Sequence, residues 1–167
     1  MKPYLYILAV LLVGGGIGYY VGKKSVTYEQ SQSTLPGGGP NDSEAIRNVL
    51  KRQSEAYSRH DALLLLRDCS PAYVEINGNN GESYNLEKSL ISYHELFTAG
   101  KGINYNLINP EIQISKNLAI IKASYSKTSD SFEKEGIKGF VGNGVWILSK
   151  TNGRWQIDAF AWTEDVK

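Results

Sequence analysis

The sequence has little cysteine and no excess of charge, and each shortage excludes a class of protein. A single cysteine, Cys69, rules out an internal disulfide and a cysteine-based metal cluster. The formal net charge is only +1, and near the amino terminus the pair Lys23-Lys24 is not part of a longer basic run. A nucleic-acid binder would usually show an excess or a stripe of basic residues. The two histidines, His60 and His94, have no acidic pattern around them that would make a metal motif. We therefore expect no metal, no cofactor and no nucleic-acid partner.

One long uncharged stretch, residues 4–22, lies near the amino terminus. It reads YLYILAVLLVGGGIGYYVG, and as a helix it would span roughly 28 Å, close to the hydrocarbon thickness of a bilayer. Tyrosines lie near both of its ends, where membrane proteins form aromatic belts. A cleaved signal peptide is the alternative, but Gly16-Ile17-Gly18 is a poor cleavage site. We interpret residues 1–24 as a single-pass transmembrane anchor.

Three glycines of this stretch, Gly14, Gly18 and Gly22, recur every four residues and share one helix face. Either they allow two anchors to pack closely, or they reflect the high glycine content of membrane helices. Lys2 and Lys23-Lys24 nearly balance across the stretch, so the positive-inside rule barely decides its orientation. A short amino terminus before a whole domain favours placing that domain outside the cytoplasm. Residues 25–40 are polar and rich in Ser, Gln, Gly and Pro, which predicts a flexible linker.

The patterning of residues 41–167 predicts one domain in which helices come first and strands follow. Helices are expected to begin near Asn41, Asp61 and Asn85, each of which can cap a helix. Strands are expected at residues 72–77, 103–109, 111–115, 118–128, 138–150 and 154–163. Pro110 predicts a bulge, and Asn152-Gly153 a hairpin turn. This order indicates an α+β fold, with helices on one face of a curved sheet.

Several segments carry a likeness to a known family. They are the end of the first helix (AYSRHDALLLL), the following SPAYVEINGNNGESY, the third helix, and the ending VWILSKTNGRWQIDAFAW. With these segments, residues 43–163 resemble the nuclear transport factor 2-like superfamily, and more closely its SnoaL-like bacterial members. The resemblance implies a cone-shaped curved antiparallel sheet wrapped around three helices, the cystatin-like roll, with a pocket at its open end. The superfamily includes isomerases, polyketide cyclases, dehydratases and non-catalytic binding or assembly domains, so function must be argued from the site.

Enzymes of this fold use a carboxylate or imidazole as base and a hydroxyl to stabilise an oxyanion. Glu75 is the most attractive base because it shares a strand face with Tyr73 and Asn77. The alternative is that Val74 and Ile76 face the core and Glu75 faces solvent. Asp158 is a second candidate base and Tyr57 a candidate oxyanion donor. The expected pocket lining is Tyr57, His60, Tyr73, Asn77, Tyr93, His94, Tyr125 and Trp162.

The two histidines have simpler interpretations than catalysis. His60 is expected to help end the first helix, with its cation complementing the helix dipole. His94 lies off the centre of the apolar stripe of its helix, which predicts a place at the rim. Cys69 follows the apolar run Leu63–Leu66, which predicts a buried structural thiol.

The last strand weighs against catalysis. If Trp155 and Ile157 face inward, the next inward residues are Ala159 and Ala161, which are inert, unless a one-residue bulge reverses the register. Asp158 and Trp162 would then face the opposite side, a surface that such domains use for dimerisation.

We therefore predict a membrane-tethered, non-catalytic ligand-binding or protein-assembly domain. The expected partners are a second copy of the chain and either a small hydrophobic ligand or an envelope protein. Two alternatives stay open. One is a small-molecule isomerase, cyclase or dehydratase with a pocket carboxylate as general base, and the other is a component of a cell-envelope secretion or transport complex.

Overall fold

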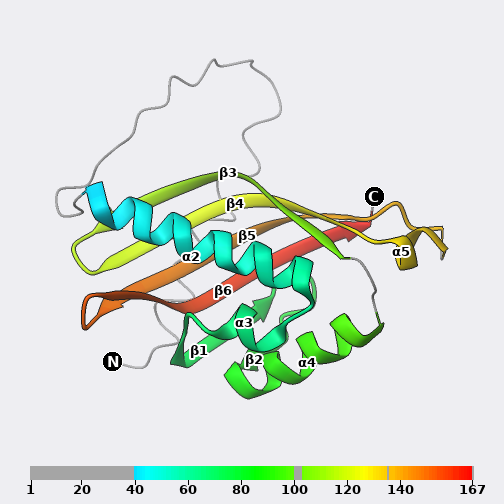
Figure 1. Cartoon of the computed structure of the whole chain (residues 1–167), viewed down its shortest axis with the longest axis horizontal. Coiled ribbons are helices and arrows are strands. Elements are labelled where there is room, and N and C mark those ends of the chain that lie inside the picture. The colour runs from blue at the N-terminus through cyan, green and yellow to red at the C-terminus, as the bar shows by residue number, and fades with distance from the viewer. Residues whose placement is uncertain (1–39, 100–102, 135, 167) are drawn as a thin grey trace, which may run out of the picture. The chain divides into compact units, whose positions relative to one another are not determined.

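The computed structural model describes residues 40–99, 103–134 and 136–166 (Figure 1). The described residues belong to one compact unit. The expected anchor at residues 1–24, with Gly14, Gly18 and Gly22, and the linker up to residue 39 lie outside the described residues. Within the described residues, no helix is long and apolar enough to cross a bilayer.

The three expected helices are present, and two of them begin at the predicted caps. They are α2 (Pro40–Arg59), α3 (Ala62–Leu66) and α4 (Leu86–Ala99). The side chain of Asp61 accepts a hydrogen bond from the backbone N–H of Leu64 at 2.9 Å, and that of Asn85 accepts one from Lys88 at 2.9 Å. Both are N-caps of the kind that the sequence predicts. A further short helix, α5 (Asp130–Lys134), lies where only a polar loop was expected.

Six strands form a single sheet. In chain order they are β1 (Cys69–Asn77), β2 (Ser83–Asn85), β3 (Asn104–Ser115), β4 (Leu118–Thr128), β5 (Phe140–Thr151) and β6 (Arg154–Val166), and their order in the sheet is β2-β1-β6-β5-β4-β3. The short strand β2 was not predicted. The resemblance implied a wholly antiparallel sheet. That expectation is wrong for one pair of strands, because β1 lies parallel to β6. This parallel pair joins the early part of the domain to its last strand.

The hydrophobic core lies between the helices and one face of the sheet. Helix α2 runs across β3, β4 and β5, while α4 lies near β1 and β2 (Figure 1). Val49 and Ile46 on α2 and Trp146, Leu148 and Ile157 on the sheet are almost completely buried. The amino-terminal end of α2 is held to the last hairpin, because Asp42 accepts from Lys150 Nζ at 2.5 Å and from Trp155 Nε1 at 3.0 Å. Core burial and this contact fix α2 over the sheet.

The pairing of the described strands shifts register at three places, one of them between Cys69 and Val74 in the parallel β1–β6 pair. The other two are bulges in antiparallel pairs. The first lies between Ile108 and Glu111 on β3, as Pro110 predicted. The second lies in β6, where Ile157 pairs with Leu148 and Ala159 with Ile147, so that Asp158 has no partner on β5. This extra residue reverses the inside and outside of the rest of the strand.

The register assumed from the sequence for the last strand is therefore wrong after Ile157. Phe160 pairs with the inward-facing Trp146 and its ring stacks on it at 4.6 Å, so Phe160 faces the helices. Because side chains alternate along a strand, Trp162 and Glu164 follow on the same inner face. Ala159 and Ala161 face the opposite side, so the inert residues line the outer face and the polar ones line the interior.

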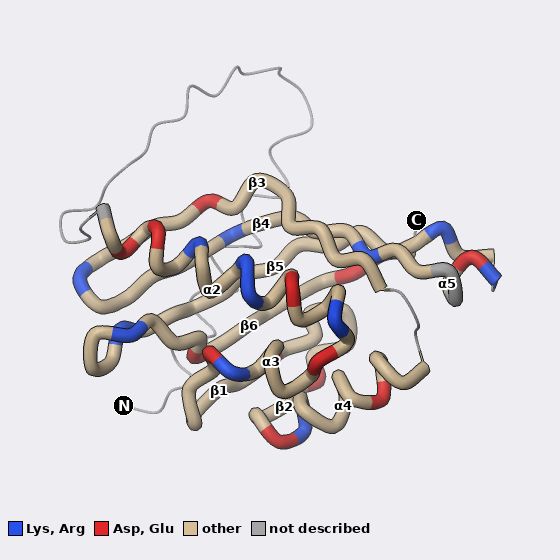
Figure 2. Tube along the Cα trace, viewed as in Figure 1, with Lys and Arg blue, Asp and Glu red and all other residues tan. Residues whose placement is uncertain are grey.

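Charged residues of both signs are spread along the described chain. Figure 2 shows Lys and Arg interspersed with Asp and Glu along the described helices and strands, without a stripe of one sign. This arrangement fits the near-zero net charge of the chain.

Candidate functional site

Glu75 lies in the interior of the domain, with only 6% of its surface exposed. Its carboxylate accepts three hydrogen bonds. Tyr93 Oη and Trp162 Nε1 donate to Oε1 at 2.8 and 2.9 Å, and Tyr73 Oη donates to Oε2 at 3.2 Å. A buried charge requires such compensation, since an unpaired carboxylate would be expensive to desolvate. The interpretation that places Glu75 on a solvated outer face is therefore wrong.

Three separate elements bring these donors together. Tyr73 and Glu75 lie two residues apart on β1, so both side chains point to the inner face of the sheet. Tyr93 lies on the buried side of α4, and Trp162 belongs to β6. Trp162 reaches Glu75 only because the bulge at Asp158 turns it inward. The site thus depends on a two-residue strand period, a helical period and one irregularity in the sheet.

The tyrosines around Glu75 are held in their neutral, donating form. Burial raises the pKa of Tyr73 and Tyr93 well above the ordinary tyrosine value near 10, and the negative charge of Glu75 raises both further. Burial also raises the pKa of Tyr57, which lies beside them. At neutral pH these hydroxyls are therefore hydrogen-bond donors and not bases.

Aromatic side chains fill the space that would form a substrate pocket. Tyr57 packs edge-on against Tyr93 and Phe97, with ring centroids 5.9 and 5.5 Å apart, and it stacks on Tyr105 at 4.5 Å. The cavity between α2, α3, α4 and the sheet measures only about 10 Å³, roughly the space that one water molecule needs. Its lining comprises Gln53, Tyr57, Leu65, Leu66, Tyr73, Tyr93, Tyr105, Trp146 and Phe160. The described interior therefore has no room for a substrate molecule beside Glu75.

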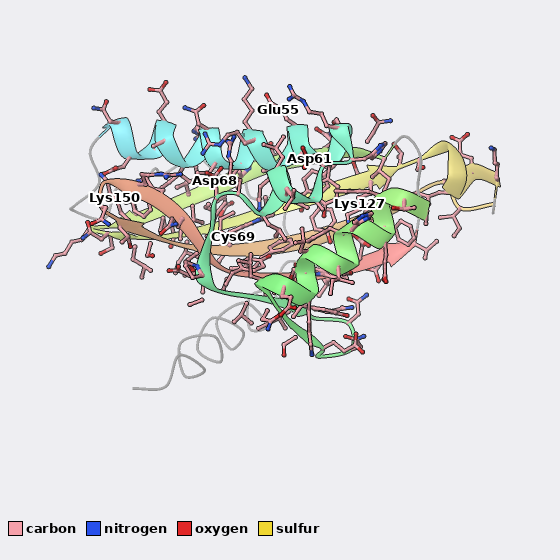
Figure 3. The ribbon with its side chains drawn as sticks, turned by 60° about the horizontal axis from the view of Figure 1, so that its bottom comes forward. Glu55, Asp61, Asp68, Cys69, Lys127 and Lys150 are labelled. Atoms are coloured by element: carbon pink, nitrogen blue, oxygen red, sulfur yellow. The ribbon has the colours of Figure 1, made fainter. Side chains whose placement is uncertain are left out.

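An ion pair lies next to this aromatic cluster. Lys127 Nζ is 2.6 Å from Glu164 Oε1, and the two side chains are only 13% and 16% exposed. Lys127 points inward from β4, among the side chains between the sheet and the helices (Figure 3). Trp162 connects the two charged groups, because its indole N–H donates to Glu75 while its ring lies 5.6 Å from Lys127 Nζ.

The remaining predicted site residues divide into two groups. Tyr57 and Tyr125 are almost fully buried in the aromatic cluster, and the hydroxyl of Tyr125 donates to the backbone carbonyl of Thr163 at 3.2 Å. Asn77 is the last residue of β1, and its side chain accepts from the N–H of Asn79 in the following turn at 2.9 Å. Asp158 is the unpaired residue of the bulge, and its charge acts on Cys69 rather than on the cluster.

The two histidines lie apart from Glu75. His94 is exposed on α4, with Nδ1 3.1 Å from Thr98 Oγ1. His60 ends α2 in a left-handed conformation (φ 54°), and its Nε2 accepts a hydrogen bond from the N–H of Ile103 at 3.0 Å. That bond needs the neutral ring, so His60 ends the helix as expected but does so without the predicted cation.

Cys69 is buried at 7% exposure, as its apolar surroundings predicted. Burial is the main cause that raises the pKa of its thiol, which disfavours the reactive thiolate. Among the described residues, no three His, Cys, Asp or Glu side chains gather in a way that could hold a metal ion.

Sequence reasoning missed Lys127 and Glu164. The signal for Lys127 is its position in β4, because it follows the buried residues Ala123 and Tyr125 with a period of two. Glu164 could not be found in this way, since its inward direction depends on the bulge and on β6 extending past Thr163.

We expect Glu75→Ala to lower the free energy of unfolding by about 3 kcal/mol, because three buried donors lose their acceptor. Chemical denaturation monitored by circular dichroism measures the change. Glu82→Ala is the matched control: Glu82 also accepts from a tyrosine two residues away, Tyr84, at 2.6 Å, but on the exposed surface. The control should behave like the wild type. Equal stability of the two variants would contradict the structural role of Glu75.

Alkaline pH should unfold the domain through its tyrosines. Because the pKa of Tyr57, Tyr73 and Tyr93 is raised in the folded state, stability is complete below about pH 10 and falls as the pH rises further, where the unfolded chain gains tyrosinate. We expect the tyrosinate absorbance of these residues to rise together with loss of the circular dichroism signal. Gradual ionisation of all tyrosines in a folded domain would refute this.

Comparisons with known proteins show the fold. A scan against family models found no match, and a search of curated proteins found none either. Among solved structures, a protein of unknown function with a cystatin-like fold from Nostoc punctiforme superposes with a TM-score of 0.64 at 14% identity, covering 77% of this chain and 95% of that one.

Two further structures agree. An NTF2-like protein of unknown function from Pseudomonas putida has a TM-score of 0.67 at 12% identity, covering 76% of this chain and 89% of its own. A ketosteroid isomerase-like protein from Erwinia carotovora has a TM-score of 0.58 at 15% identity, covering 72% and 94%. The described domain has the α+β fold of the cystatin-like and NTF2-like proteins, as the resemblance implied.

Proposed function

We propose that this chain is a membrane-tethered, non-catalytic assembly domain that pairs with a second copy of itself through the outer face of its sheet. The observation that carries the proposal is the filled interior. A cavity of about 10 Å³ leaves no place for a substrate, and Glu75 already accepts three hydrogen bonds. A general base must lie within hydrogen-bond reach of the substrate proton, and the filled interior leaves no position for a substrate beside Glu75. The outer surface is therefore the part of this domain that is available for contact with another protein.

The outer face of the sheet supports pairing. Apolar residues lie there in two adjacent rows that cross neighbouring strands, the first made of Val74, Ala159, Ile147 and Ile120 and the second of Ile76, Ala161 and Val145. The described helices α2 and α3 contribute their buried residues to the opposite face. A contiguous apolar patch on a sheet is typical of a protein–protein interface. A two-fold axis would place the same rows of both copies in contact.

The tether is the second part of the proposal and rests on the sequence. Residues 4–22 contain no charged side chain and are long enough for one bilayer crossing. A polar stretch of sixteen residues, 25–40, then separates them from the domain. Two copies joined through their sheets would bring two anchors together, and the glycine face of Gly14, Gly18 and Gly22 suits close helix contact.

Sedimentation of a chain beginning at Ser33 tests the assembly. We expect a dimer, and we expect Ile147→Lys to give a folded monomer, because the charge would lie at the centre of the interface. Ile91→Lys is the control, since Ile91 is 54% exposed on α4, away from the sheet. The full chain should in addition pellet with membranes, whereas the shortened chain should not. A wild-type monomer at about 100 µM would refute the interface.

Glu75 also supports a second candidate, an isomerase or dehydratase. A desolvated carboxylate next to neutral tyrosine hydroxyls is the equipment for moving a proton beside a carbonyl group, and one structural neighbour is named ketosteroid isomerase-like. If this candidate is right, a panel of conjugated ketones and hydroxy-ketones should yield a turnover that Glu75→Gln abolishes and Glu82→Gln preserves. If turnover survives Glu75→Gln, or if the wild type shows no turnover, the enzyme candidate is rejected and the assembly function remains.

A further inference from the structure

The ion pair of Lys127 and Glu164 lies in an unusual environment for two charged side chains. The ammonium group is surrounded by aromatic rings. Its nitrogen lies 5.3 Å from the ring centroid of Tyr125, 5.6 Å from Trp162 and 5.7 Å from Tyr57. Rings at this distance attract a cation through the negative charge density of their faces. We call these three rings, together with the carboxylate of Glu164, the cation cage.

The cage has the composition of a binding site for an ammonium ligand. Several aromatic faces that enclose a cation, with an anionic group beside them, form the arrangement that proteins use for quaternary ammonium and methylated amines. The carboxylate of Glu164 is only 16% exposed, so its attraction for a cation is weakly screened by water. An ion pair that only stabilises the fold can form without three aromatic rings around it and without such low exposure to solvent.

The walls of the cage do not depend on the lysine. Tyr57 is held by its edge-on packing against Phe97 at 5.5 Å, and Tyr125 by its hydrogen bond to the backbone of β6 at 3.2 Å. Trp162 is held by its hydrogen bond to Glu75 at 2.9 Å. Contacts that do not include Lys127 therefore hold all three rings, which preorganises the cage.

Lys127 is the part of this cluster that can move. Its side chain is a flexible four-carbon stem with the charge at the tip, and 13% of it is already exposed. Among the described residues, Glu164 is the carboxylate that it contacts. Rotation about the stem would carry the ammonium group into water, where it is well solvated. The cage would then be empty and would leave Glu164 without its cation.

We propose that the cation cage is a binding site for a small alkylammonium ligand, a quaternary ammonium or a protonated amine, which displaces the ammonium group of Lys127 and takes its place against Glu164. Lys127 acts as an internal competitor that fills the site when the ligand is absent. The cage lies on the inner side of the sheet, so this binding goes beyond the assembly proposed for the outer face and does not depend on it.

Internal competition has a quantitative consequence. The apparent affinity of the ligand is its intrinsic affinity reduced by the fraction of molecules in which the cage is empty. Removing the lysine should therefore tighten binding, which is the opposite of the usual result when a binding-site residue is truncated. Lys127→Ala removes a propylamine fragment beyond the β-carbon, so propylammonium should fit the space that it leaves.

Calorimetric titration of the full chain in detergent with tetramethylammonium chloride tests the proposal, with sodium chloride at equal ionic strength as the blank. We expect saturable binding to the wild type, binding about tenfold tighter to Lys127→Ala, and binding about tenfold weaker to Glu164→Gln. Lys51→Ala is the matched control, because Lys51 pairs with Glu55 at 3.9 Å on the open surface of α2. It should bind like the wild type.

Thermal unfolding gives an independent readout. Propylammonium should raise the melting temperature of Lys127→Ala more than that of the wild type, because the ligand restores a cation beside Glu164. No saturable binding to the wild type, or a folded Lys127→Ala that binds no tighter, would overturn the proposal. If Lys127→Ala does not fold, the wild type and Glu164→Gln decide the matter, since equal affinities for tetramethylammonium would exclude the cage.

Discussion

The interior of this domain is organised by one buried negative charge. A carboxylate removed from water must find donors, and Glu75 finds them on three elements: Tyr73 on its own strand, Tyr93 on α4 and Trp162 on β6. These bonds tie the early half of the domain to its last strand. They also fix the rings of the donors, so the aromatic packing around them follows from the same requirement.

Trp162 links the buried Glu75 to a second charged group, the ion pair of Lys127 and Glu164. Trp162 gives its N–H to Glu75 and presents its ring to Lys127, and Lys127 pairs with Glu164 two residues farther along β6. Close packing makes this arrangement compact. At Gly144, opposite Trp162, an added β-carbon would lie 2.5 Å from the Trp146 ring, so the strand needs a residue without a side chain there. Aromatic rings thus occupy the space where a substrate would otherwise lie.

The filled interior and the apolar outer face give the domain two sides of different chemistry. The inner side holds charges and rings that suit recognition of a cation, and the outer side carries rows of Val, Ile and Ala that suit contact with another sheet. The two proposed roles use different residues, so each can be changed without the other.

Local signals in the sequence were enough for the class of fold and for every described element except the short strand β2 and the short helix α5. Caps at Asp61 and Asn85, the bulge at Pro110 and the Asn152-Gly153 turn act over a few residues, and the structure confirms all of them. The inward direction of Glu75, Trp162 and Glu164 was decided only by the tertiary structure. Alternation tells which residues share a face but not which face is buried, and one unpaired residue in β6 exchanges the two faces.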